Sequence, residues 1–324
     1  MTLAIQIHAT GGPEVLQWEQ VEVGEPGTGE VRMRQTAVGL NFIDVYFRSG
    51  AYPSPGLPFI PGMEAVGVVE AIGAGVQGLS VGDRVAYGRN MGGYTQARLI
   101  AADALIKVPD NLEDKQVASV MLQGMTTEYL LQRTYPVKSG DTILFHAASG
   151  GVGLMACQWA SSLGVTVIGT VGSEEKAELA KAHGCAHTIL YKDEDFVAKV
   201  MEITEGKGVP VVYDSVGKDT FLKSLDCLQP RGMMVSFGQS SGAVEAFNPG
   251  LLSAKGSLYL TRPTLMTYAA SREDLVASSS AVFEMMSKGA LKVNVNQTFA
   301  LADAADAHRA LEARQTTGST VLVV

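Results

Sequence analysis

The chain has 324 residues, a length that suits two domains of about 100 to 200 residues better than one. Hydrophobic residues make up 46% of it and charged residues 18%, so disordered and fibrous classes of protein are excluded. A net charge of −8 argues against nucleic acid as a partner. No apolar run reaches about 18 residues and no basic-then-apolar leader opens the chain, so neither a membrane span nor a secretory signal is expected. The three cysteines form no Cys-x-x-Cys pair, which favours a reducing, cytoplasmic setting.

Residues 1–124 are rich in Gly and Pro and contain short β-rich runs at 30–38, 65–71 and 83–86. Turn signals such as Glu25-Pro26-Gly27 separate these runs. The pattern predicts an irregular β domain.

From about residue 125 the pattern changes, because apolar runs of strand length now alternate with helical segments. Six runs are the strand candidates: 141–148, 165–171, 186–191, 209–214, 232–238 and 257–262. Strands that alternate with helices predict a parallel sheet covered on both faces, here a doubly wound α/β domain over 125–265.

The last part of the chain does not continue this alternation. We expect a helix at 271–288, a strand at 291–295, a helix at 302–314 and a final strand at 320–324. We infer that residues 266–324 pack back on the first domain and complete it.

The strongest motif lies where the first apolar run turns into a helix. Residues 149–153 read Ser-Gly-Gly-Val-Gly, and backbone N–H groups at such a junction favour a diphosphate. Gly150 and Gly151 let the backbone approach the ligand, and Gly153 lets the helix lie close to the sheet. Ala148 stands where the usual Gly-x-Gly-x-x-Gly begins, so a simple tight turn is the alternative. The six-strand context favours the dinucleotide site.

The tip of the second strand indicates which dinucleotide binds. An NAD enzyme offers Asp or Glu to the ribose about 20 residues after the glycine motif, but this strand is followed by Gly172 and Ser173. A hydroxyl at a helix N-terminus with Lys176 nearby suits a 2′-phosphate, although Lys176 could also be a solvated helix lysine. NADPH is therefore the expected cofactor.

The zinc ligands of medium-chain alcohol dehydrogenases, which share this two-part pattern, are replaced here. Residues 62–64 read Gly-Met-Glu instead of Gly-His-Glu, and residues 38–41 read Val-Gly-Leu-Asn where the first catalytic cysteine would stand. The cluster His183, Cys185 and His187 is interrupted by Gly184, which favours turn and strand packing over metal binding. No metal site is expected, because zinc takes Cys and His ligands.

Five segments, 39–46, 61–67, 147–153, 237–242 and 256–263, resemble the zinc-independent quinone oxidoreductases, which are similar to zeta-crystallin. The resemblance implies a GroES-like catalytic domain, a Rossmann domain with a six-stranded sheet, an active cleft between the two, and a homodimer formed through the sheet edge at 256–260. Gln239 stands where that family has Asn.

The resemblance also implies the site residues. The catalytic candidates, bordering nicotinamide and substrate, are Asn41, Asp44, Tyr46 and Tyr52. The cofactor-binding candidates are Asn41, Thr127, Ser149, Gly150, Gly151, Val152, Gly153, Gly172, Ser173, Lys176, Tyr191, Phe237, Ser240, Thr261 and Arg314. From the residues alone, Tyr46 and Tyr52 could be packing residues and Arg314 a solvated helix end.

The expected activity is direct hydride transfer from C4 of NADPH to a quinone without zinc. Two alternatives remain open: an NADPH-dependent reductase of enones or 2-alkenals, and a non-catalytic NADPH-binding protein. Nothing in the sequence distinguishes a quinone from an enone as the acceptor.

Overall fold

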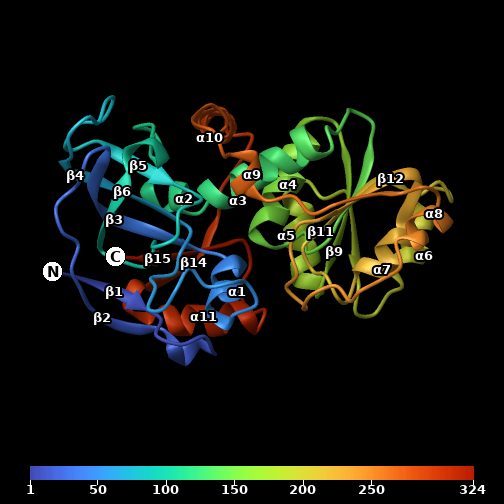
Figure 1. The fold of residues 1–324 in the computed structure, drawn as a ribbon. Coiled ribbons are helices and arrows are strands. Elements are labelled where there is room, and N and C mark those ends of the chain that lie inside the picture. The colour runs from blue at the N-terminus through green and yellow to red at the C-terminus, as the bar shows by residue number, and fades with distance from the viewer. The chain divides into compact units, whose positions relative to one another are not determined.

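The computed structural model describes residues 1–324 and divides them into two compact units (Figure 1). The first unit comprises residues 1–125, 269–287 and 293–324, and the second comprises 126–268 and 288–292. Both termini of the chain belong to the first unit.

A seven-stranded sheet forms the frame of the first unit, in the order β14-β15-β3-β4-β5-β7, with β6 pairing to β3. Its strands are β3 (Glu30–Leu40), β4 (Glu64–Ile72), β5 (Arg84–Tyr87), β6 (Ala97–Ala101), β7 (Ile106–Lys107), β14 (Val295–Ala300) and β15 (Ser319–Val323). A separate hairpin joins β1 (Thr2–Gln6) and β2 (Gln17–Val21). The final strand β15 runs antiparallel to the end of β3, with Thr320 opposite Leu40. The irregular β domain predicted for the N-terminal part is confirmed.

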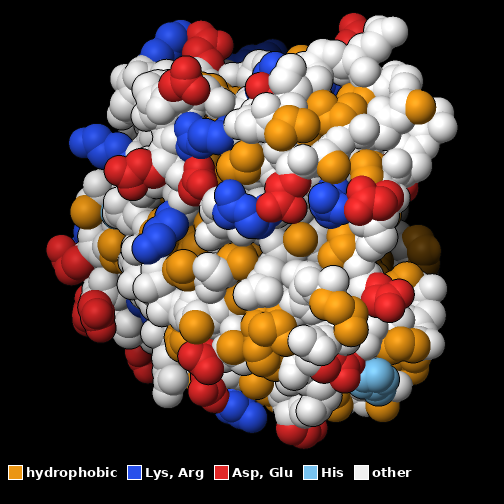
Figure 2. Space-filling model, turned by 90° about the vertical axis from the view of Figure 1, so that its left-hand side faces the viewer, with side chains coloured by type: hydrophobic (Ala, Val, Ile, Leu, Met, Phe, Trp, Pro, Cys, Tyr) orange, Lys and Arg blue, Asp and Glu red, His pale blue; other side chains and the backbone are white.

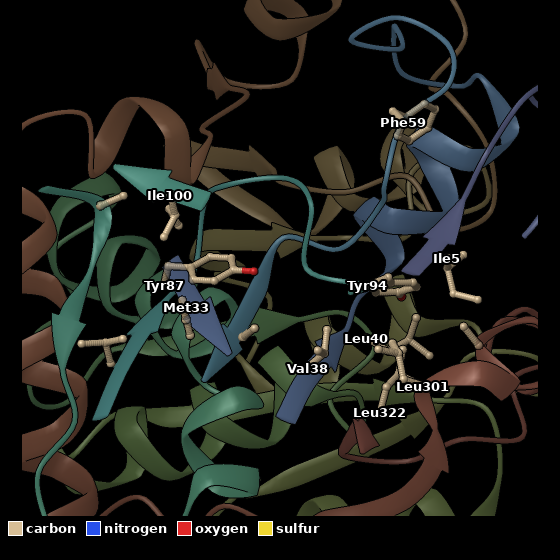
Figure 3. Close-up of a cluster of buried hydrophobic side chains, with 14 of the residues drawn as sticks. Ile5, Met33, Val38, Leu40, Phe59, Tyr87, Tyr94, Ile100, Leu301 and Leu322 are labelled. Atoms are coloured by element: carbon tan, nitrogen blue, oxygen red, sulfur yellow. The ribbon is translucent and has the colours of Figure 1, made fainter. Parts of the chain in front are cut away.

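Alternating apolar residues of these strands build the core of the unit (Figure 3). Met33, Val38 and Leu40 of β3, Tyr87 of β5 and Leu322 of β15 are all at most 2% exposed. The period of two places one face of β3 inside over residues 31–35, whereas residues 37–40 are buried on both faces. The helices of this unit are α1 (Phe42–Ser49), α2 (Asp114–Ala118), α10 (Arg272–Ser287) and α11 (Ala304–Glu312). Helix α3 (Met121–Tyr129) leads into the second unit.

The second unit is built on a six-stranded sheet in the order β10-β9-β8-β11-β12-β13, with every pair parallel. The strands are β8 (Thr142–Phe145), β9 (Thr166–Val171), β10 (His187–Leu190), β11 (Val209–Asp214), β12 (Leu228–Ser236) and β13 (Tyr259–Thr261). Five of the six predicted runs contain one of them, and the run predicted at 232–238 overlaps the second half of β12. The order reverses direction at β8, which is the arrangement of a Rossmann fold.

Helices connect and cover these strands: α4 (Gly151–Ser162), α5 (Glu174–Ala182), α6 (Phe196–Ile203), α7 (Phe221–Ser224), α8 (Gly250–Ala254) and α9 (Leu265–Tyr268). The strands read as continuous apolar runs because both faces are buried. Leu144, Ile168, Ile189, Val212 and Met234, one from each of the first five strands, are at most 1% exposed.

The prediction of a strand at 291–295 is wrong. Leu291, Val293 and Val295 alternate as in a strand, but the paired strand is β14, which begins where the predicted one ends. Its position is set by β15, since Thr298 lies opposite Val321 and Phe299 opposite Leu322.

No helix has the length and apolar character needed to cross a membrane. On the face drawn in Figure 2, Lys and Arg side chains alternate with Asp and Glu, and no continuous basic stripe lies on that face.

Candidate functional site

The turn after β8 brings α4 against the end of the strand. Ala147 adopts a left-handed conformation (φ 55°), and its carbonyl oxygen accepts a hydrogen bond from the Gly150 N–H at 3.0 Å. A Cβ at Gly153 would lie 2.4 Å from that same oxygen, so only glycine permits this approach. No side chain caps α4 at Gly150. The N–H groups of its first turn and the positive end of the helix dipole therefore form a place where a diphosphate can bind.

The buried imidazole of His146 supports this turn. His146 is completely buried, and its Nδ1 lies 2.9 Å from the hydroxyl of Thr170, which also accepts the Ala147 N–H at 3.4 Å. Its Nε2 lies 2.8 Å from the hydroxyl of Ser224, which already donates to Thr220 O. Burial lowers the pKa of His146, so a neutral imidazole with the proton on Nε2 satisfies both contacts.

The tip of β9 leads into α5 through Gly172 and Ser173. Ser173 is the N-cap of α5, and its hydroxyl accepts the Lys176 N–H, as predicted. A Cβ at Gly172 would make ordinary contacts of 3.7 Å with the ring of Tyr191 and with Cε of Lys192. The tip thus presents a hydroxyl, an aromatic ring and two lysines, and no carboxylate follows the strand directly.

The loop after β12 carries Phe237 and Ser240, and Thr261 ends the neighbouring strand β13. Arg262 holds this loop, because its guanidinium donates to Gly238 O at 2.8 Å, to Ser236 Oγ at 3.0 Å and to Gln239 Oε1 at 3.2 Å. The glutamine that departs from the family pattern therefore has a partner within its own unit.

In the first unit, Asn41 and Asp44 form a capping box at the start of α1. The Asn41 N–H donates to Asp44 Oδ2 at 2.9 Å. The Asn41 amide is fixed in one orientation, because its Nδ2 donates to Glu64 Oε1 at 2.6 Å and its Oδ1 accepts from Gln123 at 3.0 Å. Gln123 accepts in turn from Ser319 of β15 at 2.9 Å.

Two buried carboxyl groups surround Asn41. Burial raises the pKa of Glu64 to about 8, against the opposing effect of hydrogen bonds from the Leu122 N–H and from Asn41. Burial likewise raises the pKa of Asp44 to about 7, and its Oδ1 has no hydrogen-bond partner. Both groups therefore bind protons within the physiological pH range.

The aromatic candidates lie side by side at the end of α1. The rings of Tyr46 and Tyr52 are 5.0 Å apart, and the Tyr52 N–H donates to Tyr46 O at 3.0 Å. Thr127 is fully buried in α3 and belongs to the second unit with the turn at 147–153. Arg314, which follows α11 with φ 59°, belongs to the first unit.

Several polar residues of these sites were not among the candidates taken from the sequence. Glu64 and Gln123 hold Asn41, His146 and Thr170 hold the turn after β8, and Arg262 holds the loop after β12. Each bonds to a partner at least 20 residues away along the chain, and only a motif that combines both partners could have revealed it.

The comparisons with known proteins cover the whole chain. Residues 27–110 match the model of the alcohol dehydrogenase GroES-like domain, and residues 151–278 match the model named zinc-binding dehydrogenase. A quinone oxidoreductase of Pseudomonas aeruginosa is 54% identical over the full length of both chains. A 2-haloacrylate reductase of Burkholderia is 48% identical, over 100% of this chain and 99% of the relative.

A solved structure of Escherichia coli quinone oxidoreductase complexed with NADPH superposes with a TM-score of 0.98. The two chains are 48% identical over 99% of this chain and 100% of the other.

The residues around Asn41 do not fit the zinc ion that the name of one matching model suggests. The polar groups there are two amides and two carboxyl groups that bond to one another, whereas catalytic zinc takes at least two imidazole or thiolate ligands. No group of three or more His, Cys, Asp and Glu side chains is placed to hold a metal ion. With full-length relatives at 48% to 54% identity, the chain belongs to the quinone oxidoreductase family of medium-chain dehydrogenases/reductases.

Proposed function

We propose that this protein is an NADPH-dependent oxidoreductase that reduces a quinone by direct hydride transfer. The observation that carries the proposal is the turn at 147–153, where Gly153 allows α4 to approach Ala147 within a distance that no side chain would permit. The solved relative that is complexed with NADPH, at 48% identity, supports the choice of cofactor. NADPH, when bound, supplies a hydride from C4 of its nicotinamide.

The residues of the second unit bind the two ends of the cofactor in this proposal. The first turn of α4 holds the diphosphate, with Ser149 beside it. Ser173, Lys176 and Tyr191 hold the 2′-phosphate. Phe237, Ser240, Thr261 and Thr127 lie along the nicotinamide half.

Residues 41–52 of the first unit orient the acceptor and stabilise the charge that develops on its oxygen. The Asn41 amide keeps one N–H beyond the one that Glu64 accepts, and Tyr52 carries a hydroxyl. Either can donate to an oxygen of the quinone as it becomes a phenolate. The hydride adds two electrons and one proton, and a second proton from solvent or from such a donor completes the hydroquinone.

An alkene conjugated to a carbonyl or carboxylate is the second candidate acceptor. The Burkholderia relative named 2-haloacrylate reductase is as similar to this chain, at 48%, as the quinone oxidoreductase 1 of Escherichia coli. The same cofactor and the same donors would serve hydride addition to the conjugated carbon.

A panel of acceptors tests the proposal. Loss of NADPH is followed by absorbance with quinones, enones, 2-alkenals and 2-haloacrylates, each also with NADH. Faster oxidation with quinones and with NADPH is expected. A preference for conjugated alkenes would select the second candidate, and NADPH binding without any acceptor-dependent oxidation would make the protein a non-catalytic binder.

We also propose a cytoplasmic homodimer that forms through β13. This strand pairs with β12 on one side only, and Tyr259 and Leu260 in it are 59% and 39% exposed. An exposed apolar edge strand favours pairing with another chain. The three free, buried cysteines suit a reducing compartment. Sedimentation equilibrium at the dimer mass supports this proposal, and a monomer at micromolar concentration contradicts it.

A further inference from the structure

Helix α1 determines where most of the proposed acceptor-binding residues lie. Asn41 caps it, Asp44 and Tyr46 are part of it, and Tyr52 follows it and bonds back to it. A shift of this short helix would move all four together. The contacts that fix its two ends therefore bear on the reaction.

The C-terminal end of α1 is fixed by Arg48, which is 1% exposed although it is charged. Its Nη1 donates to Nδ1 of His308 in α11 at 2.9 Å. Its two terminal nitrogens also donate to the carboxylate of Glu312, at 2.8 and 2.7 Å, and its Nε donates to Gly11 O. A buried guanidinium requires such partners, because an unpaired charge inside a protein is strongly destabilising.

The N-terminal end of α1 is tied to the same imidazole through Tyr94. The Tyr94 hydroxyl donates to Asp44 Oδ2 at 3.1 Å, and its oxygen lies 3.0 Å from Nε2 of His308. The single proton of the hydroxyl goes to Asp44, and Arg48 can only donate. His308 therefore accepts at Nδ1 and donates from Nε2–H to Tyr94.

This chain of hydrogen bonds lies in a buried, apolar part of the unit. His308 and Tyr94 are completely buried, and Tyr94 lies among apolar side chains that include Leu40 and Leu301 (Figure 3). In an apolar environment, a hydrogen bond is stronger and its loss costs more than at the surface.

We propose that His308 is a positioning residue, which holds both ends of α1 and thereby sets the position of residues 41–52 for the acceptor. The inference rests on the proposed function, since that function makes these residues the acceptor-binding ones. His308 itself lies one side chain removed from Asp44 and two from Asn41, so it acts through them.

Three substitutions separate the two hydrogen bonds of the imidazole. His308→Phe removes both, His308→Gln keeps a donor where Nε2 lies and so serves Tyr94, and His308→Asn keeps an acceptor where Nδ1 lies and so serves Arg48. Tyr94→Phe breaks the same chain at the next link and provides a second route if His308→Phe does not fold. Leu105→Ala is the matched control, because it removes a fully buried side chain of the same unit and none of these hydrogen bonds.

We expect His308→Phe to lower kcat/KM for the acceptor by about 10- to 100-fold, because a misplacement of about 1 Å costs that much. The Kd for NADPH should change by less than about threefold, since most of its proposed contacts are in the other unit. His308→Gln should recover most of the activity and His308→Asn should not, because the link through Tyr94 leads directly to Asp44 and Asn41.

Hydrogen exchange tests the inference without cofactor or acceptor. Backbone amides of residues 41–52 should exchange faster in His308→Phe than in Leu105→Ala at matched global stability. Equal exchange in the two variants, or equal kcat/KM for the acceptor, would overturn the inference. If the wild-type protein oxidises no NADPH with any acceptor, the proposed function fails, and the exchange result still decides whether His308 positions α1.

Discussion

Gly153→Ala is the most direct perturbation of the proposed diphosphate site. The new methyl group would lie 2.4 Å from Ala147 O and 2.7 Å from two backbone atoms of Ala148, where ordinary contacts begin near 3.4 Å. The first turn of α4 must therefore retreat by about 1 Å from the end of β8. A displacement of this size lowers the function of a site roughly 100-fold where its geometry matters. Overpacking lowers the free energy of unfolding by about 1 to 3 kcal/mol.

We accordingly expect the Kd for NADPH to rise by about 10- to 100-fold and the second unit to lose about 1 to 2 kcal/mol of unfolding free energy. Fluorescence titration measures the first quantity and urea unfolding the second. The control is Gly27→Ala, since a Cβ at Gly27 meets only the flexible carboxylate of Glu30, at 3.2 Å. An unchanged Kd in a destabilised Gly153→Ala protein would show that the close packing is structural only and that the diphosphate binds elsewhere.

Three further predictions concern the proton donor, cofactor choice and pH. Tyr52→Phe should lower kcat by about 10- to 100-fold if its hydroxyl stabilises the developing oxyanion, and unchanged steady-state kinetics would remove it from that role. Gly172 lies at a position with room for a side chain, and Gly172→Asp should shift the preference toward NADH by placing a carboxylate where the 2′-phosphate binds. The ratio of the Kd values for NADPH and NADH measures this shift, and an unchanged ratio would contradict the prediction. Glu64 and Asp44 have pKa values raised by burial to about 8 and about 7, so the folded state holds more protons than the unfolded state and stability falls as pH rises from 6.5 to 8. Below pH 6.5 His308 opposes this trend, because burial lowers its pKa to about 3. Urea unfolding should therefore be compared at pH 6.5 and pH 8. Glu64→Gln should reduce the difference, and an equal pH dependence in the variant would refute the assignment.

The sequence predicted those parts of the fold that depend on local chemistry. The six apolar runs became the six parallel strands, and Ser173 caps α5 as its hydroxyl indicated. The turn at 147–153 was recognisable because glycines have a steric role that can be read residue by residue. Strand β14 was misplaced because its position depends on β15, some 24 residues further along, and not on its own alternation.

The polar contacts that fix the candidate residues could not be predicted in the same way. Asn41 was identified from a family resemblance, but the orientation of its amide depends on Glu64 and Gln123, which are 23 and 82 residues away. Arg48 and His308 are separated by 260 residues. A single sequence does not show which buried polar groups meet, because each of them is satisfied only by a partner that the folded chain supplies.

Titration of the protein with NADPH and with NADH tests the central claim most directly. If the first turn of α4 holds the diphosphate and Ser173 and Lys176 hold the extra phosphate, NADPH should bind at least about tenfold more tightly. Added salt should reduce that preference, because it screens the charges that cause it. Equal affinities for the two nucleotides at low salt, or no binding of either, would contradict the account.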